Sequence, residues 1–473
     1  MAKILEKGLT FADVLLVPKK TPLDSRSQAD TTSRFTKNIS LSVPLVSSNM
    51  ASVTEHKTAI ALAREGGIGV IHQFMPIAEQ CAEVRKVKKS TSYIIKHPVT
   101  IPPETTIQEA VDRMAEEGVT GLLVTENQGL RGIFTSRDYL FEKEYSKPVS
   151  AVMTPREKMV TAPHTISIED ARALLHRHRI EKLPLLDGDR VVGLVRTRDL
   201  KKLEIWSKAT RDSEGRLRVA AAVGIKDAFE RGKALVAAGA DVLVVDIAHG
   251  HSDHMVECIR MLKKEFSVDV LAGNIATAEA AEALIAAGVD GLKVGVGPSS
   301  VCTTRIMSGA GMPQLTAIIN VASVAQKHGV PVCADGGISY PGDVVKAIAA
   351  GASSCMIGRL FAGTDEAPGL IISKEGRKYK QYYGSASFES AVERKQRIDG
   401  RTVKEQIESF VEGVATLVEY KGPVRDVIMS LVRGLQSGIS YGGAQTIAEL
   451  QKNAEFVEIT PHGWRESLSR GIR

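Results

Sequence analysis

Five short apolar runs in the second half of the chain decide its fold class. They are DVLVVDIAHG (241–250), VDVLAGN (268–274), GLKVGVG (291–297), VPVCADGG (330–337) and SSCMIG (353–358). Each run ends in glycine or asparagine, and most of the gaps hold amphipathic, alanine-rich stretches such as TAEAAEALIAAG and GDVVKAIAAG. Continuous apolar runs are typical of buried parallel strands, and amphipathic stretches are typical of the helices that connect them. The pattern therefore predicts an α/β fold with a parallel sheet.

Earlier runs of the same kind bring the number of predicted strands to eight. They are PLVSSN (44–49), GIGVIHQ (67–73) and RVAAAVG (218–224). Eight parallel strands with intervening helices favour a closed TIM (β/α)8 barrel, whose catalytic groups follow the C-terminal ends of the strands. A doubly wound open sheet is the alternative, but no G-x-G-x-x-G motif opens a helix after the first strand.

An internal repeat interrupts the spacing of the strands after the second one. PVTIPPETTIQEA (98–110) matches MVTAPHTISIEDA (159–171), and GIFTSRD (132–138) matches GLVRTRD (193–199), both at an offset of 61 residues (159 − 98 and 193 − 132). A single offset that links two separate segments indicates a true repeat. Each copy is predicted to run strand, helix, strand, strand, helix.

The repeat divides the chain into two predicted domains. We expect residues 1–92 and 205–473 to form the catalytic barrel and residues 93–204 to form an inserted module. The two repeats of the module lie at about 93–150 and 154–204.

The inserted repeat resembles a tandem pair of CBS motifs, the Bateman module. This resemblance implies a module that binds purine nucleotides. Thr135 with Asp138, and Thr197 with Asp199, match the positions that hold a ribose in that family. The alternative for each pair is that its side chains only cap the following helix.

The segment KVGVGPSSVCTTRIMSGAGMPQ (293–314) carries the strongest indication of chemistry. Its glycines permit close approach of the backbone to a ligand, and successive N–H groups can bind phosphate. Cys302 lies between a strand end and a polar loop, where a thiol can act as an exposed nucleophile. The other four cysteines are expected to serve packing or surface roles, and they are Cys81, Cys258, Cys333 and Cys355.

Several further motifs, together with that segment, resemble the IMP dehydrogenase and GMP reductase family across the whole barrel. They are LTFADVLLVPKKT (9–21), NMASVTEHKTAIALAREGGIGVIH (49–72), VDIAHGHS (245–252), AGNIAT (272–277), ADGGISYPGDVVKAIAAGA (334–352) and FAGTDEAPG (361–369). The resemblance implies a nicotinamide-dependent oxidoreductase that acts on purine nucleoside monophosphates.

The family's roles carry over to specific residues of this chain. The resemblance makes Cys302 the nucleophile that adds to C2 of the purine, and it makes Thr304 and Glu412 a proton relay. Asp335 would grip the ribose hydroxyls, and Asp246 and Asn274 would face the nicotinamide. The other substrate positions, several of them around the phosphate, are Ser48, Met50, Ser300, Gly337, Gly358, Tyr382 and Gly384.

The resemblance also implies a monovalent cation, K⁺ in the family, held by the backbone carbonyls of Gly297, Ser299 and Cys302. Ser299 stands where the family has glycine, so a positive φ there would strain the backbone. Arg359 replaces a small residue near the phosphate, where it could add a charge-assisted contact or point to solvent.

The reductase and dehydrogenase hypotheses differ in what they require of a mobile flap, which we expect at about residues 385–410. Dehydrogenases carry an Arg-Tyr pair in the flap, and this chain has Arg397 followed by Ile398. Asn49 and Tyr383 also resemble reductases. The stretch AQTIAELQKNAEFVEITPHGWRES (444–467) reads more like a dehydrogenase, whereas Ala51 and Ser385 depart from both patterns.

The balance favours a GMP reductase that converts GMP to IMP and ammonia with NADPH, through a covalent Cys–XMP intermediate. The first alternative is an IMP dehydrogenase that oxidises IMP to XMP with NAD. The second alternative is a non-catalytic nucleotide sensor, which would have no need for a nucleophilic cysteine. The family further implies a homotetramer, and CBS modules often pair tetramers into octamers.

Composition limits the remaining possibilities. The net charge is +6 and aromatic residues make up 5%, so a nucleic-acid partner is not expected. No apolar stretch approaches the roughly 18 residues of a membrane span, and the first residues do not resemble a signal peptide. Five widely spaced cysteines argue against a disulfide framework, so we expect a cytoplasmic protein.

A metal site is a possible interpretation of three nearby histidines, His249, His251 and His254. The simpler interpretation is that they are polar loop residues near the cofactor.

Overall fold

The computed structural model describes residues 7–90, 94–96, 98–388, 390, 392 and 412–468. The chain divides into two compact units. The first contains residues 1–90, 208–213 and 217–473, and the second contains residues 91–207 and 214–216. The ends of the second unit lie within a few residues of the boundaries predicted for the inserted module.

The first unit is a closed barrel of eight strands, each parallel to its neighbours. The strands are β4 (Leu45–Ser47), β5 (Ile68–Ile71), β14 (Ala220–Val223), β15 (Val242–Asp246), β16 (Asp269–Ile275), β17 (Gly291–Val294), β18 (Val332–Asp335) and β19 (Ser354–Ile357). Each strand falls within one of the eight apolar runs, except that β16 extends one residue beyond its run, to Ile275. The predicted TIM barrel is therefore confirmed. The doubly wound alternative is wrong.

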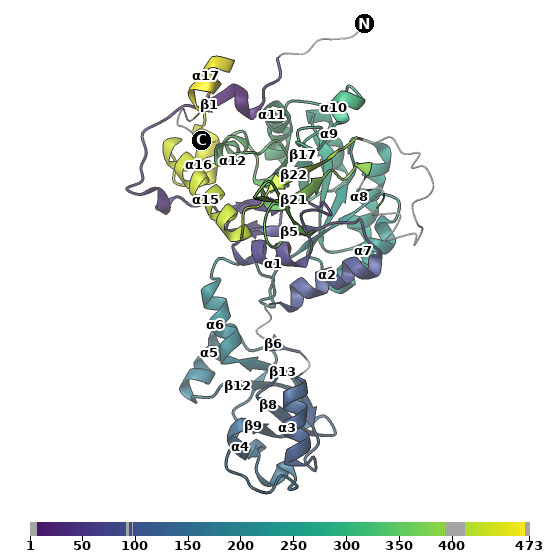
Figure 1. The fold of residues 1–473 in the computed structure, drawn as a ribbon, viewed down its shortest axis with the longest axis vertical. Coiled ribbons are helices and arrows are strands. Elements are labelled where there is room, and N and C mark those ends of the chain that lie inside the picture. Colours follow the sequence, from purple (N-terminus) through teal and green to yellow (C-terminus); the bar gives the residue numbers. More distant parts are fainter. Residues whose placement is uncertain are drawn as a thin grey trace. The chain divides into compact units, whose positions relative to one another are not determined.

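Helices surround the barrel and cover the outward faces of its strands (Figure 1). They include α1 (His56–Arg64), α2 (Ile77–Lys89), α7 (Ala228–Ala238), α8 (Asp253–Glu265), α9 (Ala278–Ala286), α11 (Gln314–Ala325), α12 (Pro341–Ala349) and α15 (Val424–Tyr441). Their starts follow local chemistry, since Ser252 and Thr277 accept N-terminal backbone hydrogen bonds of α8 and α9. Both faces of the strands are therefore buried, which explains their uninterrupted apolar sequences.

Side chains that point into the barrel form a separate apolar core. Val46, Val70, Val244, Leu271 and Met356 belong to this cluster and are fully buried. A TIM barrel is filled by such layers of side chains, so the functional groups can lie only at its rim.

Additional elements lie beyond the barrel strands of the first unit. β20 (Ile371–Lys374), β21 (Arg377–Tyr383) and β22 (Ala415–Glu419) form an antiparallel sheet. β1 (Val14–Leu16) pairs with β23 (Phe456–Glu458), which brings residues near the two ends of the chain together. Further short elements of the unit are β2 (Ser33–Arg34), β3 (Ser40–Leu41), α10 (Thr304–Met307), α13 (Arg359–Ala362), α16 (Ile447–Asn453) and α17 (Pro461–Glu466).

The second unit has the predicted order of elements in both repeats. The first repeat contains β7 (Thr100–Ile101), α3 (Ile107–Glu116), β8 (Gly121–Glu126), β9 (Gly129–Thr135) and α4 (Ser136–Tyr139). The second contains β11 (Ala162–Pro163), α5 (Ile168–Arg177), β12 (Lys182–Asp187), β13 (Arg190–Arg196) and α6 (Thr197–Ile205). β6 (Ile94–Ile95) and β10 (Thr154–Pro155) complete one eight-stranded sheet across both repeats.

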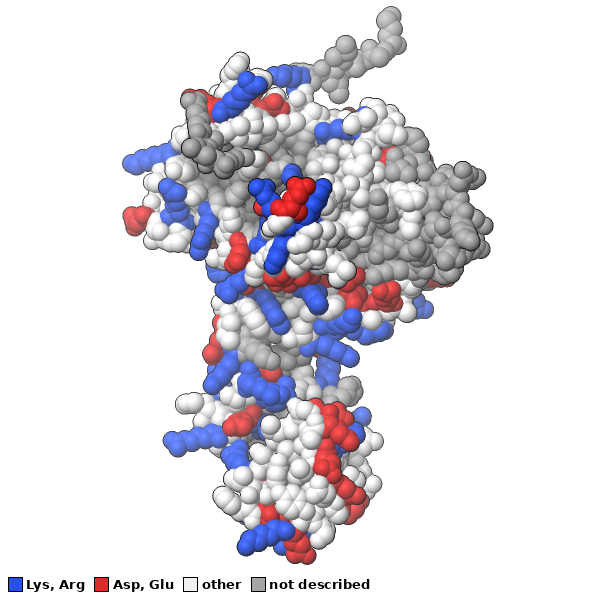
Figure 2. Space-filling view, in the orientation of Figure 1, with Lys and Arg blue, Asp and Glu red and all other residues white. Residues whose placement is uncertain are grey.

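The surface carries charges of both signs. Figure 2 shows Lys, Arg, Asp and Glu side chains interspersed over the viewed face of each unit. Within the described residues, no helix combines the length and hydropathy needed to cross a bilayer.

Candidate active site

A cavity of about 290 Å³ opens at the C-terminal ends of the barrel strands. It collects most of the residues singled out from the sequence. Those that line it are Ser48, Met50, Asp246, Asn274, Gly297, Ser299, Cys302, Thr304, Asp335, Gly358, Tyr382, Gly384 and Glu412. Ser300 is exposed, and neither Ser300 nor Gly337 lines the cavity.

The chain between β17 and α11 contains the short helix α10 and a loop in which Cys302 is half-buried. The Cys302 Sγ donates to Thr304 Oγ1 at 3.2 Å, and that hydroxyl donates to Glu412 Oε2 at 2.6 Å. The three side chains thus form one hydrogen-bonded chain from a thiol to a carboxylate. A carboxylate linked through a hydroxyl can deliver or accept a proton beside the sulfur.

Backbone hydrogen bonds bring Glu412 to the loop. The Thr303 N–H donates to the Glu412 carbonyl at 2.8 Å, and the Val414 N–H donates to the Val301 carbonyl at 3.0 Å. The Glu412 N–H in turn donates to the Ala386 carbonyl at 3.1 Å. The position of the carboxylate is therefore fixed by main-chain pairing as well as by Thr304.

The guanidinium of Arg305 connects the two ends of the same loop through hydrogen bonds. Its Nε donates to the Val296 carbonyl at 3.2 Å, and its Nη2 donates to the Met312 carbonyl. Gly297 has φ +81°, and a Cβ there would lie 2.5 Å from Arg305 Cγ. Only glycine leaves space for this arginine, which explains part of the glycine-rich pattern.

One wall of the cavity is built on Lys293, which is 2% exposed. Its Nζ lies 2.7 Å from Asp246 Oδ1 and 2.8 Å from Asp335 Oδ2, and it also donates to Asn274 Oδ1. Burial alone would lower the pKa of Lys293, but the two carboxylates outweigh it and raise that pKa. The sequence analysis did not select Lys293, although a lysine inside the apolar run GLKVGVG was a signal.

Asn49 completes this wall. It is 2% exposed, and its Nδ2 donates to Asp246 Oδ2 at 2.6 Å. Asp246 therefore receives a hydrogen bond on each oxygen, from Asn49 and from Lys293.

The buried phenol of Tyr382 also lines the cavity. Its hydroxyl lies 3.4 Å from Ser299 Oγ and 3.7 Å from Met50 Sδ. Burial raises the pKa of Tyr382 to about 12, so the phenol remains neutral and can donate a hydrogen bond to an anion. A Cβ at Gly358 would lie 2.6 Å from this hydroxyl, so residue 358 must be small.

Ser299 and Arg359, which depart from the family pattern, both lie in described parts of the structure. Ser299 is not among the residues with positive φ, so the backbone strain considered in the sequence analysis does not arise at this residue. Its carbonyl accepts the Cys302 N–H at 3.1 Å and keeps a second lone pair. Arg359 is exposed and lies outside the cavity lining, at the first residue of α13.

The other cysteines and the histidines do not form a second reactive centre. Cys333 and Cys355 are fully buried, and burial raises the pKa of Cys333 to about 12. Burial also raises the pKa of Cys258 to about 11, so these thiols stay protonated. In the part of the chain that the structure describes, no group of three His, Cys, Asp or Glu side chains could hold a metal ion.

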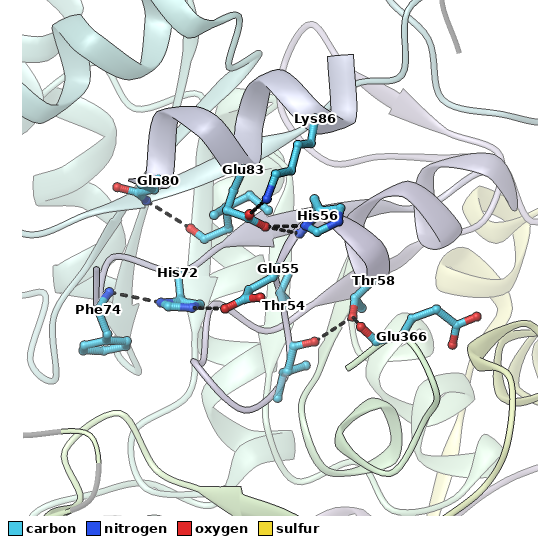
Figure 3. A network of polar contacts seen from close by, with 12 residues as sticks. Thr54, Glu55, His56, Thr58, His72, Phe74, Gln80, Glu83, Lys86 and Glu366 are labelled. Atoms are coloured by element: carbon cyan, nitrogen blue, oxygen red, sulfur yellow. Dashed lines mark hydrogen bonds and ion pairs between the residues drawn. The ribbon is translucent and has the colours of Figure 1, made fainter. Parts of the chain in front are cut away.

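A polar network joins the start of α1, the segment after β5 and helix α2 (Figure 3). His72 is fully buried, and its Nδ1 accepts the Phe74 N–H at 3.1 Å while its Nε2 lies 3.7 Å from Glu55 Oε1. The neighbouring His56 and Lys86 both bond the Glu83 carboxylate. Because Gln73 and Phe74 line the cavity, this network fixes part of its wall.

The flap falls largely outside the described residues. Arg397 and Ile398, on which the reductase reading partly depends, lie in the span 393–411 that the structure does not describe. Tyr383 ends β21, and its N–H donates to Ser52 Oγ at 3.3 Å.

In the second unit the two predicted ligand pairs differ. Asp138 Oδ2 accepts from Thr135 N at 2.6 Å and from Thr135 Oγ1 at 2.7 Å, which is a helix cap. Asp199 instead accepts from Arg196 Nε at 2.5 Å, and Thr197 Oγ1 donates to the Ile180 carbonyl. Thr197 lines an open cleft of about 540 Å³, whose charged lining combines Arg172, Arg179 and Lys201 with Glu181 and Glu204.

Comparisons with known proteins agree with this geometry. A family model described as the IMP dehydrogenase / GMP reductase domain matches residues 8–469. The inosine-5'-monophosphate dehydrogenase of Aquifex aeolicus is 49% identical over 98% of this chain and 96% of its own length. The GMP reductase of Leishmania major is 46% identical over 99% and 98% of the two chains.

Solved structures of GMP reductase from Trypanosoma brucei share the fold. A cysteine-to-alanine variant in complex with guanosine 5'-monophosphate has a TM-score of 0.88 and 44% identity, with 99% of each chain covered. The same protein in complex with guanosine 5'-triphosphate has a TM-score of 0.77 and 42% identity, with 96% and 98% covered. The likeness thus extends over both units.

Proposed function

This chain belongs to the IMP dehydrogenase / GMP reductase family, and on that premise we propose that it is a GMP reductase. It removes the 2-amino group of GMP as ammonia and places a hydride at C2, so GMP, NADPH and a proton give IMP, NADP⁺ and ammonia. The observation that carries the reaction class is the hydrogen-bonded chain Cys302–Thr304–Glu412 at the mouth of the barrel.

The residues perform distinct parts of the proposed reaction. The Cys302 thiol gives its proton through Thr304 to Glu412, and the resulting thiolate attacks C2. The same proton then returns from Glu412 through Thr304 to the 2-amino group, and the C2–N bond breaks as ammonia leaves. This step leaves the purine bonded to the sulfur as a Cys–XMP intermediate. NADPH, when bound, supplies the hydride that reaches C2. The C2–S bond then breaks, and the electron pair returns to the sulfur as IMP forms.

Four side chains hold the substrate and the cofactor in this proposal, and three backbone carbonyls hold a cation. Asp335 accepts hydrogen bonds from the ribose, and Tyr382 donates to the phosphate as a neutral phenol. Asp246 and Asn274 face the nicotinamide nucleotide from the adjoining wall. The carbonyls of Gly297, Ser299 and Cys302 would hold K⁺, a task that the unstrained backbone at Ser299 permits.

The choice of reductase over dehydrogenase rests on residues, because relatives under both names are similarly identical. Asn49 is buried against Asp246 on the proposed cofactor wall, where it resembles the reductase pattern. Ile398 stands where the dehydrogenase pattern has tyrosine, so the residue that completes the water-activating pair is replaced.

A pair of assays with the full-length enzyme and potassium tests this assignment. One cuvette holds GMP with NADPH, and the other holds IMP with NAD. We expect the absorbance of the reduced nicotinamide to fall in the first cuvette, with ammonia released, and to stay constant in the second. A rise in the second cuvette alone would identify an IMP dehydrogenase, and turnover in neither would favour a non-catalytic sensor.

We further propose that the second unit is a CBS module that binds a purine nucleotide in its second repeat. The open cleft beside Thr197 supports this site, because its lining contains Arg172, Arg179 and Lys201, which can bind a phosphate. Calorimetry with GTP and ATP tests it. The affinity should fall in Arg179→Ala, and the matched change Arg131→Ala in the first repeat should leave it unchanged.

The family also suggests an assembly for the chain. We propose a homotetramer of barrels, with octamers formed where CBS modules pair two tetramers. Light scattering with and without GTP would measure both states.

A further inference from the structure

The ammonium of Lys293 is shared by side chains from three neighbouring strand ends. A lysine ammonium has three N–H donors, and Lys293 directs them to Asp246, Asp335 and Asn274. Asn274 then donates its own Nδ2 to Asp335 Oδ2 at 3.0 Å and to the Gly295 carbonyl at 2.7 Å. All three donors of a fully buried cation are therefore committed to the wall of the cavity.

The fold provides a specific place for this side chain. Gly273 on β16 lies opposite Lys293 on β17, and a Cβ at Gly273 would come 2.7 Å from Lys293 Cβ. A larger residue at position 273 would displace the lysine stem. Below Lys293 the barrel interior is apolar, so its partners are at the rim.

The carboxylates of Asp246 and Asp335 are partly exposed, and both residues line the cavity. The side chain of Asp246 is 16% exposed and that of Asp335 is 19% exposed. Hydrogen bonds from the wall hold Asp335 by Oδ2, and Oδ1 receives none from the described part of the chain. Oδ1 is therefore available to a ligand hydroxyl.

Lys293 supplies the positive charge that balances the two carboxylates of this wall. Two carboxylates this close would repel one another, and burying them without a cation is costly. Among the described residues, Lys293 is the cation that bonds both of them. Removal of its charge would leave two facing acids with only the amides of Asn49 and Asn274 as donors.

We propose that Lys293 is a positioning residue for both halves of the site, holding Asp335 toward the ribose of the purine nucleotide and Asp246 toward the nicotinamide nucleotide. The inference rests on the proposed function for the identity of the two ligands. It adds that one buried ammonium sets the affinity for both ligands. Lys293 itself touches neither the reacting carbon nor the sulfur in this role.

Binding measurements on Lys293→Met test the proposal without relying on turnover. Calorimetry with GMP alone, and fluorescence titration with NADPH alone, give the two dissociation constants. We expect both to rise by roughly 30-fold or more, as when one partner of a buried hydrogen-bonded charge pair is removed. Lys346→Met is the matched control, because Lys346 is also buried but donates to the Phe11 carbonyl outside the cavity. It should leave both constants unchanged.

A charge-balanced double variant separates positioning from a general loss of packing. Asp246→Asn combined with Lys293→Met removes one acid together with the cation, so Asp335 no longer faces a second carboxylate. We expect GMP affinity to recover to within about threefold of that of Asp246→Asn alone, while NADPH affinity stays low. A structural role would lower both affinities equally in the single and double variants.

The binding constants of the single and the double variant each decide whether Lys293 positions the two carboxylates. Wild-type affinity for both ligands in Lys293→Met, or no recovery of GMP binding in the double variant, would overturn the proposal. If the single variant fails to fold, the double variant still decides by its GMP affinity relative to Asp246→Asn. Failure of the wild-type enzyme to turn over GMP would instead contradict the proposed function and leave the binding comparison intact.

Discussion

The Thr304 hydroxyl donates a 2.6 Å hydrogen bond to Glu412 Oε2 across a sequence separation of 108 residues. The same hydroxyl accepts from the Cys302 thiol at 3.2 Å. The proposed nucleophile and the proposed proton donor for the leaving group are thus joined through one side chain. This arrangement links the glycine-rich loop to a segment that follows the flap.

Replacing Glu412 by glutamine should separate proton transfer from hydride transfer. The amide keeps the hydrogen bond with Thr304 but cannot supply a proton, so ammonia release should slow by about 10²- to 10⁴-fold. Rapid-quench measurement of ammonia in a single turnover gives this rate. Hydride exchange between IMP and NADP⁺ should change much less. Glu419→Gln, on the exposed side of β22, is the control, and equal slowing of both steps in Glu412→Gln would refute the relay.

Cys302→Ala should abolish turnover while GMP binding persists. The variant lacks the atom that bonds C2, so the rate should fall by about a thousandfold or more. Calorimetry would report the retained affinity for GMP. Cys333→Ala removes a buried thiol from the barrel interior and should lower stability while leaving the chemistry in place. Turnover of Cys302→Ala near the wild-type rate would exclude covalent catalysis.

Gly358→Ala should weaken GMP binding through Tyr382. The added Cβ would lie 2.6 Å from the phenol oxygen, so the ring must move. Overpacking of about 1–3 kcal/mol corresponds to a roughly 5- to 150-fold increase in KM for GMP. Tyr382→Phe removes the clashing oxygen, so adding Gly358→Ala to it should cost little more. Additive losses in the double variant would show that the two residues do not interact.

The stability of the protein should fall at high pH partly because of Tyr382. Burial raises the pKa of Tyr382 from 10.0 to about 12. Above pH 10 the unfolded phenol loses its proton while the folded one keeps it, so unfolding becomes more favourable as pH rises toward 12. The full effect is about 2 to 3 kcal/mol. Urea unfolding of wild type and Tyr382→Phe across this range measures it, and parallel pH profiles would contradict it.

The fold was predictable because burial leaves a direct record in the sequence. Each barrel strand, such as β15 or β18, reads as an apolar run because both of its faces are covered. The repeat in the second unit was predictable from its constant offset. The position of Cys302 followed from a strand end joined to a glycine-rich loop.

Long-range geometry accounts for what the sequence analysis missed. Lys293 lies in an apolar run, and its role depends on carboxylates contributed by β15 and β18, which periodicity does not pair. The contact between Gly358 and Tyr382 joins two segments whose spacing carries no pattern. Ser300 and Gly337 were placed by resemblance alone, and the structure leaves both outside the cavity lining.

Trapping the intermediate tests the central claim most directly. The enzyme is quenched in acid during turnover of GMP with NADPH, digested and analysed by peptide mass spectrometry. We predict a purine nucleotide, without its 2-amino nitrogen, on the peptide that contains Cys302. Turnover of GMP without an adduct on Cys302 at any quench time, or an adduct on another cysteine, would contradict the account.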